Sequence, residues 1–209
     1  MSKKENNNEG RSFGGKVIFF ATGNINKFNE ARSILSTHGF AVALLRVKGD
    51  EIQSYSLKEI ATAAARNAFK ISNLPLFVED AGLFIDMLGG FPGPYAAYAY
   101  ETIHNSGILR LMENVNDRRA QFRSVIAYID EALCDPQCFN GESNGEITQT
   151  ERKTTGKSSF GFDPIFQPSG SSKSFAEMTI EEKNGFSHRA KAIEKFAEWY
   201  KTARLVGNK

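Results

Sequence analysis

Adjacent acidic residues at two points of the chain are the first candidates for chemistry. Asp50-Glu51 and Glu79-Asp80 each follow a short apolar run, and we expect a strand over residues 76–79 to end at the second pair. Mg²⁺ takes oxygen ligands and is usually held by one or two carboxylates together with substrate phosphates. Because neighbouring side chains on a strand point to opposite faces, we expect Asp80 rather than Glu79 in the site. The alternative for each pair is a solvated turn.

A second candidate is the sequence TGNINK at residues 22–27, between an apolar run and a helical pattern. A helix N-terminus presents free N–H groups and the positive end of the helix dipole, so it binds phosphate readily. Gly23 allows close approach of the backbone, and Thr22 and Asn24 add side-chain donors. Lys27 lies one turn into the helix, within reach of a phosphate. The alternative is an ordinary cap at Asn24 with a solvated Lys27.

Aromatic and cationic residues in the last quarter of the chain form a third candidate. The loop FGFDP contains Phe160 and Phe162, which can stack on a flat base at roughly 1–3 kcal/mol per ring, and Asp163, which can accept hydrogen bonds from ring N–H groups. His188 and Arg189 begin a predicted helix against its dipole, a local conflict typical of functional sites. As donors they suit a purine with a keto oxygen at position 6. Core packing is the commoner fate of phenylalanine and is the alternative for this loop.

Apolar runs and helical patterns alternate in the first half of the chain and predict the elements that position these candidates. We expect strands at 17–20, 42–47 and 76–79 and helices at 25–38 and 57–72. This β-α-β-α-β order predicts an α/β fold. Two capping boxes predict helix starts at the sequences Ser56-Leu57-Lys58-Glu59 and Thr179-Ile180-Glu181-Glu182.

The second half of the chain contains two long strand patterns and a final amphipathic helix. Residues 120–130 alternate between two faces, and residues 139–150 follow with Gly141 and Gly145 as candidate bulges. The helix is expected over residues 188–204. We therefore expect one α/β domain over residues 16–209, with a mixed, bent central sheet flanked by helices and two lobes with a deep cleft between them.

Composition excludes several classes of protein. The formal charge of the 209 residues is only +2, which gives no basic field for nucleic acid. No apolar run approaches the ~20 residues that cross a bilayer. Residues 1–15 are polar without the apolar centre of a secretory signal, and we expect a disordered tail. Cys134 and Cys138 lack the CxxC spacing and are expected to be free thiols. We therefore expect a cytoplasmic protein with neither a nucleic-acid nor a membrane partner.

Together these segments resemble the inosine triphosphate pyrophosphatase family. The resemblance covers residues 16–204 and rests on the joint order and spacing of six motifs: TGNxxK at 22–27, EIQ at 51–53, VED at 78–80, LGGFPGPY at 88–95, FGFDPIF at 160–166 and AEMTIEEKNGFSHRAKA at 176–192. The family hydrolyses inosine, xanthosine and deoxyinosine triphosphates to the monophosphate and pyrophosphate. The resemblance implies this activity, Mg²⁺ as cofactor and a homodimer.

The resemblance also implies roles by position. The triphosphate would be held by Thr22, Gly23, Asn24, Ile25, Asn26 and Lys27. Glu51 and Asp80 would bind Mg²⁺, and the catalytic residues would be Asp80, as general base for water, and Lys27. The rest of the substrate would be bound by Ala81, Phe160, Gly161, Phe162, Asp163, Lys183, His188 and Arg189. Ala81 and Phe162 are departures, because many members of the family have Ser or Thr at the first position and Tyr or Trp at the second.

Two other functions remain open from the residues alone. A non-catalytic nucleotide-binding module would use the same phosphate turn and aromatic loop without a metal, but unpaired acids such as Glu51 and Asp80 would then repel a triphosphate. A nucleic-acid-binding protein would combine the Lys and Arg residues with the Phe residues. The near-neutral charge of the chain argues against that reading.

Overall fold

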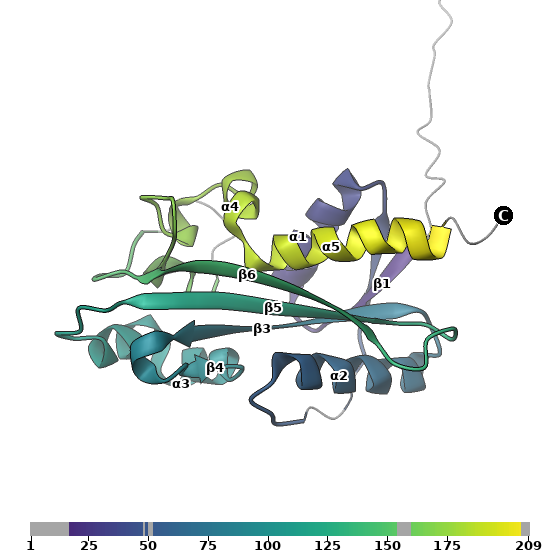
Figure 1. Cartoon of the computed structure of the whole chain (residues 1–209), viewed down its shortest axis with the longest axis horizontal. Helices are drawn as coiled ribbons and strands as arrows, with labels where there is room; N and C mark the ends of the chain where they lie inside the picture. Colours follow the sequence, from purple (N-terminus) through teal and green to yellow (C-terminus); the bar gives the residue numbers. More distant parts are fainter. Residues whose placement is uncertain (1–16, 48, 50–51, 154–159, 206–209) are drawn as a thin grey trace, which may run out of the picture.

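A seven-stranded mixed sheet runs through the molecule, and helices pack against both of its faces (Figure 1). The structure is a computed structural model that describes residues 17–47, 49, 52–153 and 160–205. The strands are β1 (Val17–Ala21), β2 (Ala41–Leu45), β3 (Leu76–Ile85), β4 (Pro92–Gly93), β5 (Arg119–Ile129), β6 (Gln137–Ile147) and β7 (Phe166–Pro168). Their order is β2-β1-β3-β5-β6-β7, with β4 paired to β3. The first three strands are parallel and the others join antiparallel, so the predicted mixed α/β fold is confirmed.

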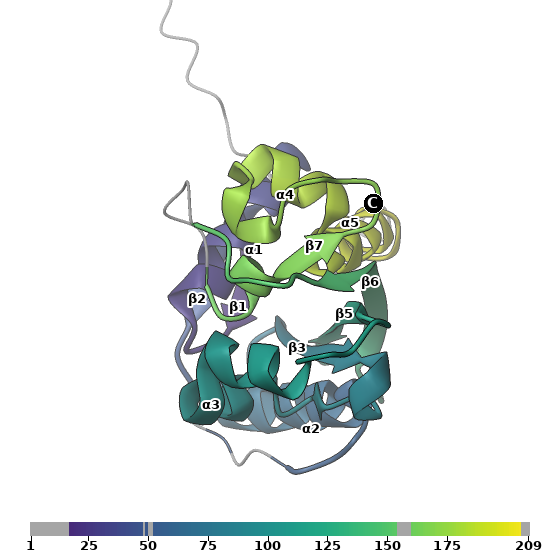
Figure 2. The same ribbon diagram turned by 90° about the vertical axis from the view of Figure 1, so that its left-hand side faces the viewer.

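Two layers of helices enclose the sheet (Figure 2). The helices are α1 (Ile25–Thr37), α2 (Leu57–Ser72), α3 (Ala96–Leu111), α4 (Ile180–Phe186) and α5 (His188–Tyr200). Successive side chains of β3 pack against opposite helix layers, because neighbouring side chains on a strand point to opposite faces. Phe77 packs with Leu35 of α1 and Phe196 of α5, whereas Val78 packs with Ala61 of α2. Both faces of the central strands are therefore buried.

β3 is longer than the sequence predicts. We expected a strand over residues 76–79 that ends in two acids, but β3 continues to Ile85. The reason is β5, which pairs with β3 at every position from Leu76 to Ile85. The parallel neighbour β1, in contrast, pairs only as far as Phe77. The acidic pair Glu79-Asp80 therefore lies in the middle of β3, just beyond the point where the pairing with β1 ends.

The two glycines of β6 are not bulges. The pairing of β5 with β6 is unbroken, and Gly141 lies opposite Ser124 and Gly145 opposite Ala120. Both glycines instead allow a close approach, because a Cβ at position 141 would lie 2.0 Å from the His188 carbonyl oxygen and one at position 145 would lie 2.3 Å from that of Gln167. α5 and β7 can therefore contact β6 directly.

Other predicted elements are confirmed with small changes. The Thr179 capping box is complete, but Ser56 forms only half of one, because the Glu59 carboxylate accepts a hydrogen bond from Ser54 instead. α3 consists of two helical segments that meet at a kink at His104, where φ is 54° and the backbone is not helical. The final helix ends at Tyr200 and continues as a π-turn over Lys201–Leu205.

Some expectations fall outside the described residues. These are the tail at 1–15, Lys16 and the acidic pair Asp50-Glu51. The division of the domain into two lobes stays a prediction. Both cysteines are free thiols, as expected. Among the described helices, none has the length and apolar character needed to cross a bilayer.

Candidate active site

A cavity of about 330 Å³ opens beside β3. Its walls come from the start of α1, residues 80–82 of β3, Pro94 with the first turns of α3, Phe122 of β5, the loop at 160–163, and the facing ends of α4 and α5. The cavity exists because residues 78–82 of β3 lie beyond the last pair with β1 and before the first pair with β4. Its volume is within the range of small-molecule sites.

The turn at 22–27 is capped by its own side chains. The Asn24 side chain accepts hydrogen bonds from the backbone N–H groups of Asn26 (2.9 Å) and Lys27 (3.2 Å), and Thr22 accepts one from Asn24. Three of the N–H groups of this turn, those of Asn24, Asn26 and Lys27, are therefore already used. Asn24 and Lys27 line the cavity, while Thr22, Gly23, Ile25 and Asn26 do not.

Lys27 contacts β3 at the edge that β1 leaves unpaired beyond Phe77. Its Nζ donates to the Glu79 carbonyl oxygen at 3.1 Å and is 2.9 Å from Glu79 Oε2. The other oxygen, Oε1, accepts hydrogen bonds from Ser124 Oγ at 2.6 Å and from Arg189 Nε at 3.1 Å. Glu79 is thus a buried anchor for two cations, whereas Asp80 next to it is half-buried and lines the cavity. The two acids therefore differ in their surroundings, and the role of Asp80 in the site stays a prediction.

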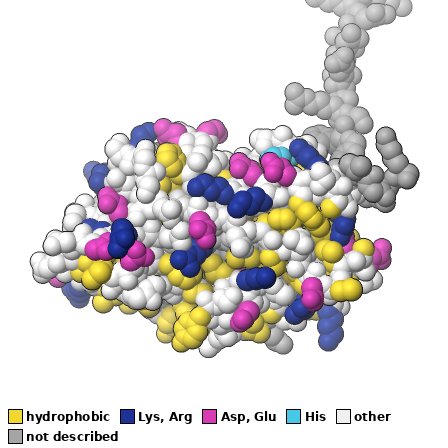
Figure 3. Space-filling view, viewed as in Figure 1, with side chains coloured by type: hydrophobic (Ala, Val, Ile, Leu, Met, Phe, Trp, Pro, Cys, Tyr) yellow, Lys and Arg dark blue, Asp and Glu magenta, His cyan; other side chains and the backbone are white. Residues whose placement is uncertain are grey.

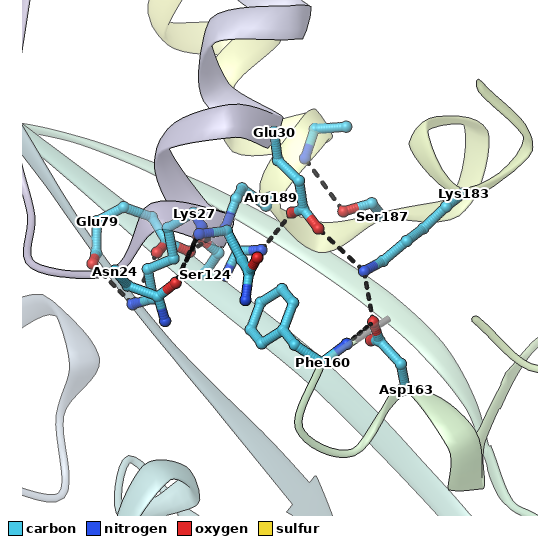
Figure 4. A network of polar contacts seen from close by, with 12 residues as sticks. Asn24, Lys27, Glu30, Glu79, Ser124, Phe160, Asp163, Lys183, Ser187 and Arg189 are labelled. Carbon is cyan, nitrogen blue, oxygen red and sulfur yellow. Dashed lines mark hydrogen bonds and ion pairs between the residues drawn. The ribbon is translucent and has the colours of Figure 1, made fainter. Parts of the chain in front are cut away.

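The ion pairs continue away from Glu79 as a chain of alternating charge (Figure 4). Arg189 Nη1 donates to Glu30 Oε2, and Lys183 Nζ donates to Glu30 Oε1 at 3.0 Å. Lys183 Nζ also donates to Asp163 Oδ2 at 2.7 Å. We call the six residues Lys27, Glu79, Arg189, Glu30, Lys183 and Asp163 the charge network. Three cations and three carboxylates balance within it.

Burial and pairing compete in setting the pKa values of the network. Burial raises the pKa of Glu30 and Glu79, but Arg189 outweighs it with help from Lys183 at Glu30 and Lys27 at Glu79, so both pKa values lie below the usual range. At Asp163 burial prevails over the attraction of Lys183, and the pKa is raised. Ionisation at Glu30 and Glu79 is therefore maintained by their cations.

His188 lines the cavity from the first turn of α5. Its ring stacks on Phe122 with centroids 4.7 Å apart and planes 8° apart. Burial, followed by the nearby Arg189, lowers the pKa of His188 well below 6.5, which leaves the ring neutral at pH 7. The buried Nδ1 has no hydrogen-bond partner among the described residues. A neutral ring with such an atom beside a cavity can hydrogen-bond to a polar ligand.

The two phenylalanines of the loop differ in their surroundings. Phe162 is only 3% exposed and packs in a core cluster, edge-on to Tyr100. Phe160 is half-buried, and Lys183 Nζ and the Arg189 guanidinium lie 5.2 and 5.4 Å from its ring centroid. Both residues line the cavity with Gly161 and Asp163. Phe160 is therefore the better placed of the two to meet a flat ligand.

The predicted metal ligands are only partly described. Asp80 lines the cavity, but Glu51 lies outside the described residues. The part of the chain that the structure describes contains no group of three or more His, Cys, Asp or Glu residues placed to hold a metal ion. One carboxylate beside a cavity still fits Mg²⁺, which takes most of its remaining ligands from substrate phosphates and water.

Two partners of the charged side chains of the site, Glu30 and Ser124, were missed from the sequence. Glu30 lies on the buried face of α1 with Ala31 and Ile34, and an acid within an apolar stripe signals a buried partner. Ser124 lies on the same face of β5 as Phe122 and Ile126, and all three side chains are buried. The sequence contains both signals, but it does not show which cations they contact.

The fold and the cavity define an α/β protein with a charged, partly aromatic site for a small molecule. Residues 18–199 match the Ham1 family, and the chain belongs to this family. It is 48% identical to a dITP/XTP pyrophosphatase of Methanopyrus kandleri over 184 residues, which cover 88% of this chain and 96% of that one. A dITP/XTP pyrophosphatase of Pyrococcus horikoshii is 47% identical over 191 residues, with coverage of 88% and 96%.

Solved structures agree with this assignment. The Ham1 protein of Staphylococcus aureus superposes with a TM-score of 0.75 at 30% identity, covering 93% of this chain and 100% of that one. A HAM1 protein from Coxiella burnetii gives 0.78 at 28% identity, with coverage of 90% and 99%. The family predicted from the motifs is confirmed, and so is the class of enzyme, because the curated relatives are pyrophosphatases.

The lowered pKa of Glu30 predicts a pH-dependent contribution to stability. A carboxyl with a depressed folded pKa stabilises the protein fully above its unfolded value of 4.5, and the contribution is lost as the pH falls through the folded pKa. At pH 7 we expect Glu30→Gln to lower the free energy of unfolding by about 3–5 kcal/mol, as for other broken buried pairs. Below pH 4.5 the difference from the wild type should shrink, as measured by urea denaturation.

The control for this experiment is Glu194→Gln, which makes the same change at an exposed position of α5. Its free energy of unfolding should stay within about 0.5 kcal/mol of the wild type at each pH. A Glu30→Gln difference that does not vary with pH would contradict the assigned ionisation.

Proposed function

We propose that this protein hydrolyses the non-standard purine triphosphates ITP, dITP and XTP to the monophosphate and pyrophosphate, in a Mg²⁺-dependent reaction. The observation that carries the proposal is the charge network together with Asp80 at one cavity. The names of the relatives at 48% and 47% identity support the choice of substrate. Removal of such nucleotides from the pool would be the role of the enzyme.

The charge balance of the network supports the need for a metal. Its three cations are already matched by three carboxylates, so the network offers little net positive charge to a triphosphate. Asp80, with Glu51, would hold the Mg²⁺. When bound, the ion supplies charge neutralisation at the phosphate oxygens.

We assign the phosphate end of the substrate to the part of the cavity near Asp80 and Lys27. The Lys27 side chain is 19% exposed, against 5% for Lys183 and 3% for Arg189, so it is the most accessible cation of the network. Lys27 would bind the triphosphate with Asn24 beside it. Asp80 would orient a water and accept its proton, a role worth roughly 10²–10⁴ in rate.

We assign the base and sugar to the other end, with Lys183, His188 and Arg189. A 6-keto purine accepts hydrogen bonds where adenine presents an amino group, so cationic donors favour the first and disfavour the second. Nδ1 of His188, which has no hydrogen-bond partner in the part of the chain that the structure describes, supports a polar ligand here, and Phe160 would stack on the base. Ala81 and Phe162 also line the cavity and would contact the substrate, Ala81 without a hydroxyl group.

We further propose a homodimer in the cytoplasm with no nucleic-acid partner. Exposed apolar side chains recur along residues 87–98, at Met87 (55%), Phe91 (41%) and Tyr98 (69%), and they suit an interface. Acidic and basic side chains are interspersed on the face seen in Figure 3, which does not favour a polyanion. The free thiols of Cys134 and Cys138 suit a reducing compartment.

Substrate selectivity is the first test of this proposal. With Mg²⁺ present, the wild type should release pyrophosphate from ITP, dITP and XTP at least about 100-fold faster than from ATP, because unpaired donors reject the wrong base strongly. Activity should be lost with EDTA and return with added Mg²⁺. Detection of pyrophosphate rather than orthophosphate identifies the bond that breaks. Equal rates with ITP and ATP would contradict the selectivity.

Asp80→Asn tests the assigned base for water. We expect kcat with ITP to fall by about 10²–10⁴, because the amide cannot accept a proton. The variant should keep the wild-type circular dichroism spectrum. Asp86→Asn, at an exposed position directly after the same strand, should remain active and serves as the control. An active Asp80→Asn variant would contradict the role.

Tyr98→Lys tests the interface. A charge at the centre of an apolar interface is strongly disfavoured, so sedimentation should show a dimer for the wild type and a monomer for this variant. Ile180→Lys, an exposed apolar position on α4 in the other helix layer, should leave the dimer intact. A monomeric wild type, or a dimeric Tyr98→Lys variant, would exclude this interface.

A further inference from the structure

We propose that the cavity wall formed by α3 recognises the sugar of the substrate, and that the Glu101 carboxylate accepts a hydrogen bond from the 2′-hydroxyl group of a ribose. The enzyme then prefers the ribonucleotide ITP to the deoxyribonucleotide dITP. This inference rests on the proposed function and deepens it, because it ranks two substrates of the same site. Glu101 is not among the residues predicted for the site, and its role follows from its place in the cavity wall.

One face of α3 lines the cavity before the kink. Ala97, Tyr100 and Glu101 all contribute to this wall, as their spacing of three and four residues along a helix allows. The first turn contributes Ala96 and Ala97, whose side chains are methyl groups. The polar side-chain atoms that α3 brings to the wall are therefore the Tyr100 hydroxyl group and the Glu101 carboxylate.

Glu101 lies between the two ends of the cavity that we assign to the phosphates and the base. α3 starts beside β3, because Gly93, shortly before the helix, pairs with β3 and lies against Gly82. About one turn into the helix, the Tyr100 ring meets Phe162 edge-on, with centroids 5.5 Å apart. Glu101 directly follows Tyr100, where the wall passes from β3 to the loop that carries Phe162. The sugar of a nucleoside triphosphate joins the phosphates to the base, so it occupies this part of the cavity.

Tyr100 fixes the part of α3 from which Glu101 extends. Its half-buried ring lies edge-on to two others, Phe162 and His104, with centroids 5.5 and 5.7 Å apart and planes at 88° in both pairs. Edge-to-face contacts favour a defined orientation of each ring. The backbone before Glu101 is therefore tied to the loop at the base end of the cavity.

Glu101 is the carboxylate of the wall that the site does not otherwise use. Among the described residues, the carboxylates that line the cavity are those of Asp80, Glu101 and Asp163. Asp80 is assigned to the Mg²⁺ and the attacking water. Asp163 accepts hydrogen bonds from the Phe160 N–H group and from Lys183 Nζ. Glu101 makes no hydrogen bond or ion pair within the part of the chain that the structure describes, so its oxygens are available to a ligand.

A carboxylate in this place suits a ribose. Hydroxyl groups donate short, charge-assisted hydrogen bonds to carboxylates, and an acidic residue holds the ribose 2′-hydroxyl group in many dinucleotide sites. dITP carries a hydrogen atom at the 2′ position and offers no such donor. Because the Glu101 side chain is exposed, water competes for its oxygens, and we expect the hydrogen bond to favour ITP by only about 10-fold.

Glu101→Ala tests the inference through the ratio of kcat/KM for ITP to kcat/KM for dITP, measured with Mg²⁺. The ratio should be about 10 for the wild type and about 1 for the variant, because alanine removes the acceptor and is well tolerated in a helix. The ratio of kcat/KM for ITP to that for ATP should stay unchanged, since the contacts to the base remain. A general structural defect lowers the values for ITP and dITP together and leaves their ratio at the wild-type value.

The matched control is Glu194→Ala, which makes the same change at an exposed helical position that does not line the cavity. It should keep the wild-type ratio of ITP to dITP. Equal kcat/KM values for ITP and dITP in the wild type, or an unchanged ratio in Glu101→Ala, would overturn the inference and leave the proposed function standing. A wild type that releases pyrophosphate from neither nucleotide would instead overturn the proposed function.

Discussion

The central constraint on this structure is that buried charges must be paired. Six ionisable side chains meet beside the cavity in alternating order, and five of them are almost completely enclosed. They come from α1, β3, the loop at 160–163, α4 and α5, which are distant in the sequence. Removal of any one leaves an uncompensated charge in a poorly hydrated place, so the relative placement of these elements is strongly determined.

The balance of the network also determines what kind of site it can make. A cluster of unpaired cations would attract any polyanion, whereas a neutral network of fixed ion pairs contributes direction more than attraction. The donors are held in orientation before a ligand arrives, which reduces the cost of ordering them. Recognition in such a site depends on the match of hydrogen-bonding groups. It depends less on the total charge of the ligand.

The motifs were sufficient to predict the family, the α/β class and most cavity residues, because helix caps, strand runs and the loop FGFDP are local patterns. The length of β3 could not be read from its own residues, since it depends on pairing with residues of β5 that lie 35 to 53 positions later. The partners of Glu79 could not be predicted either, because Lys27, Ser124 and Arg189 are all distant from it in the sequence. The phosphate turn was predicted with open N–H groups, but the Asn24 cap, which was the recognised alternative, occupies two of them.

The absence of a side chain at Gly141 affects the shape of the site. The first turn of α5 rests on β6 where this residue has no side chain, with the carbonyl oxygen of His188 in the space of a methyl group. The depth at which α5 sits on the sheet determines how far His188 and Arg189 reach into the cavity. The reach of these two side chains thus depends on a close backbone contact between α5 and β6. Any larger residue there would change the dimensions of the cavity without altering a single group that lines it.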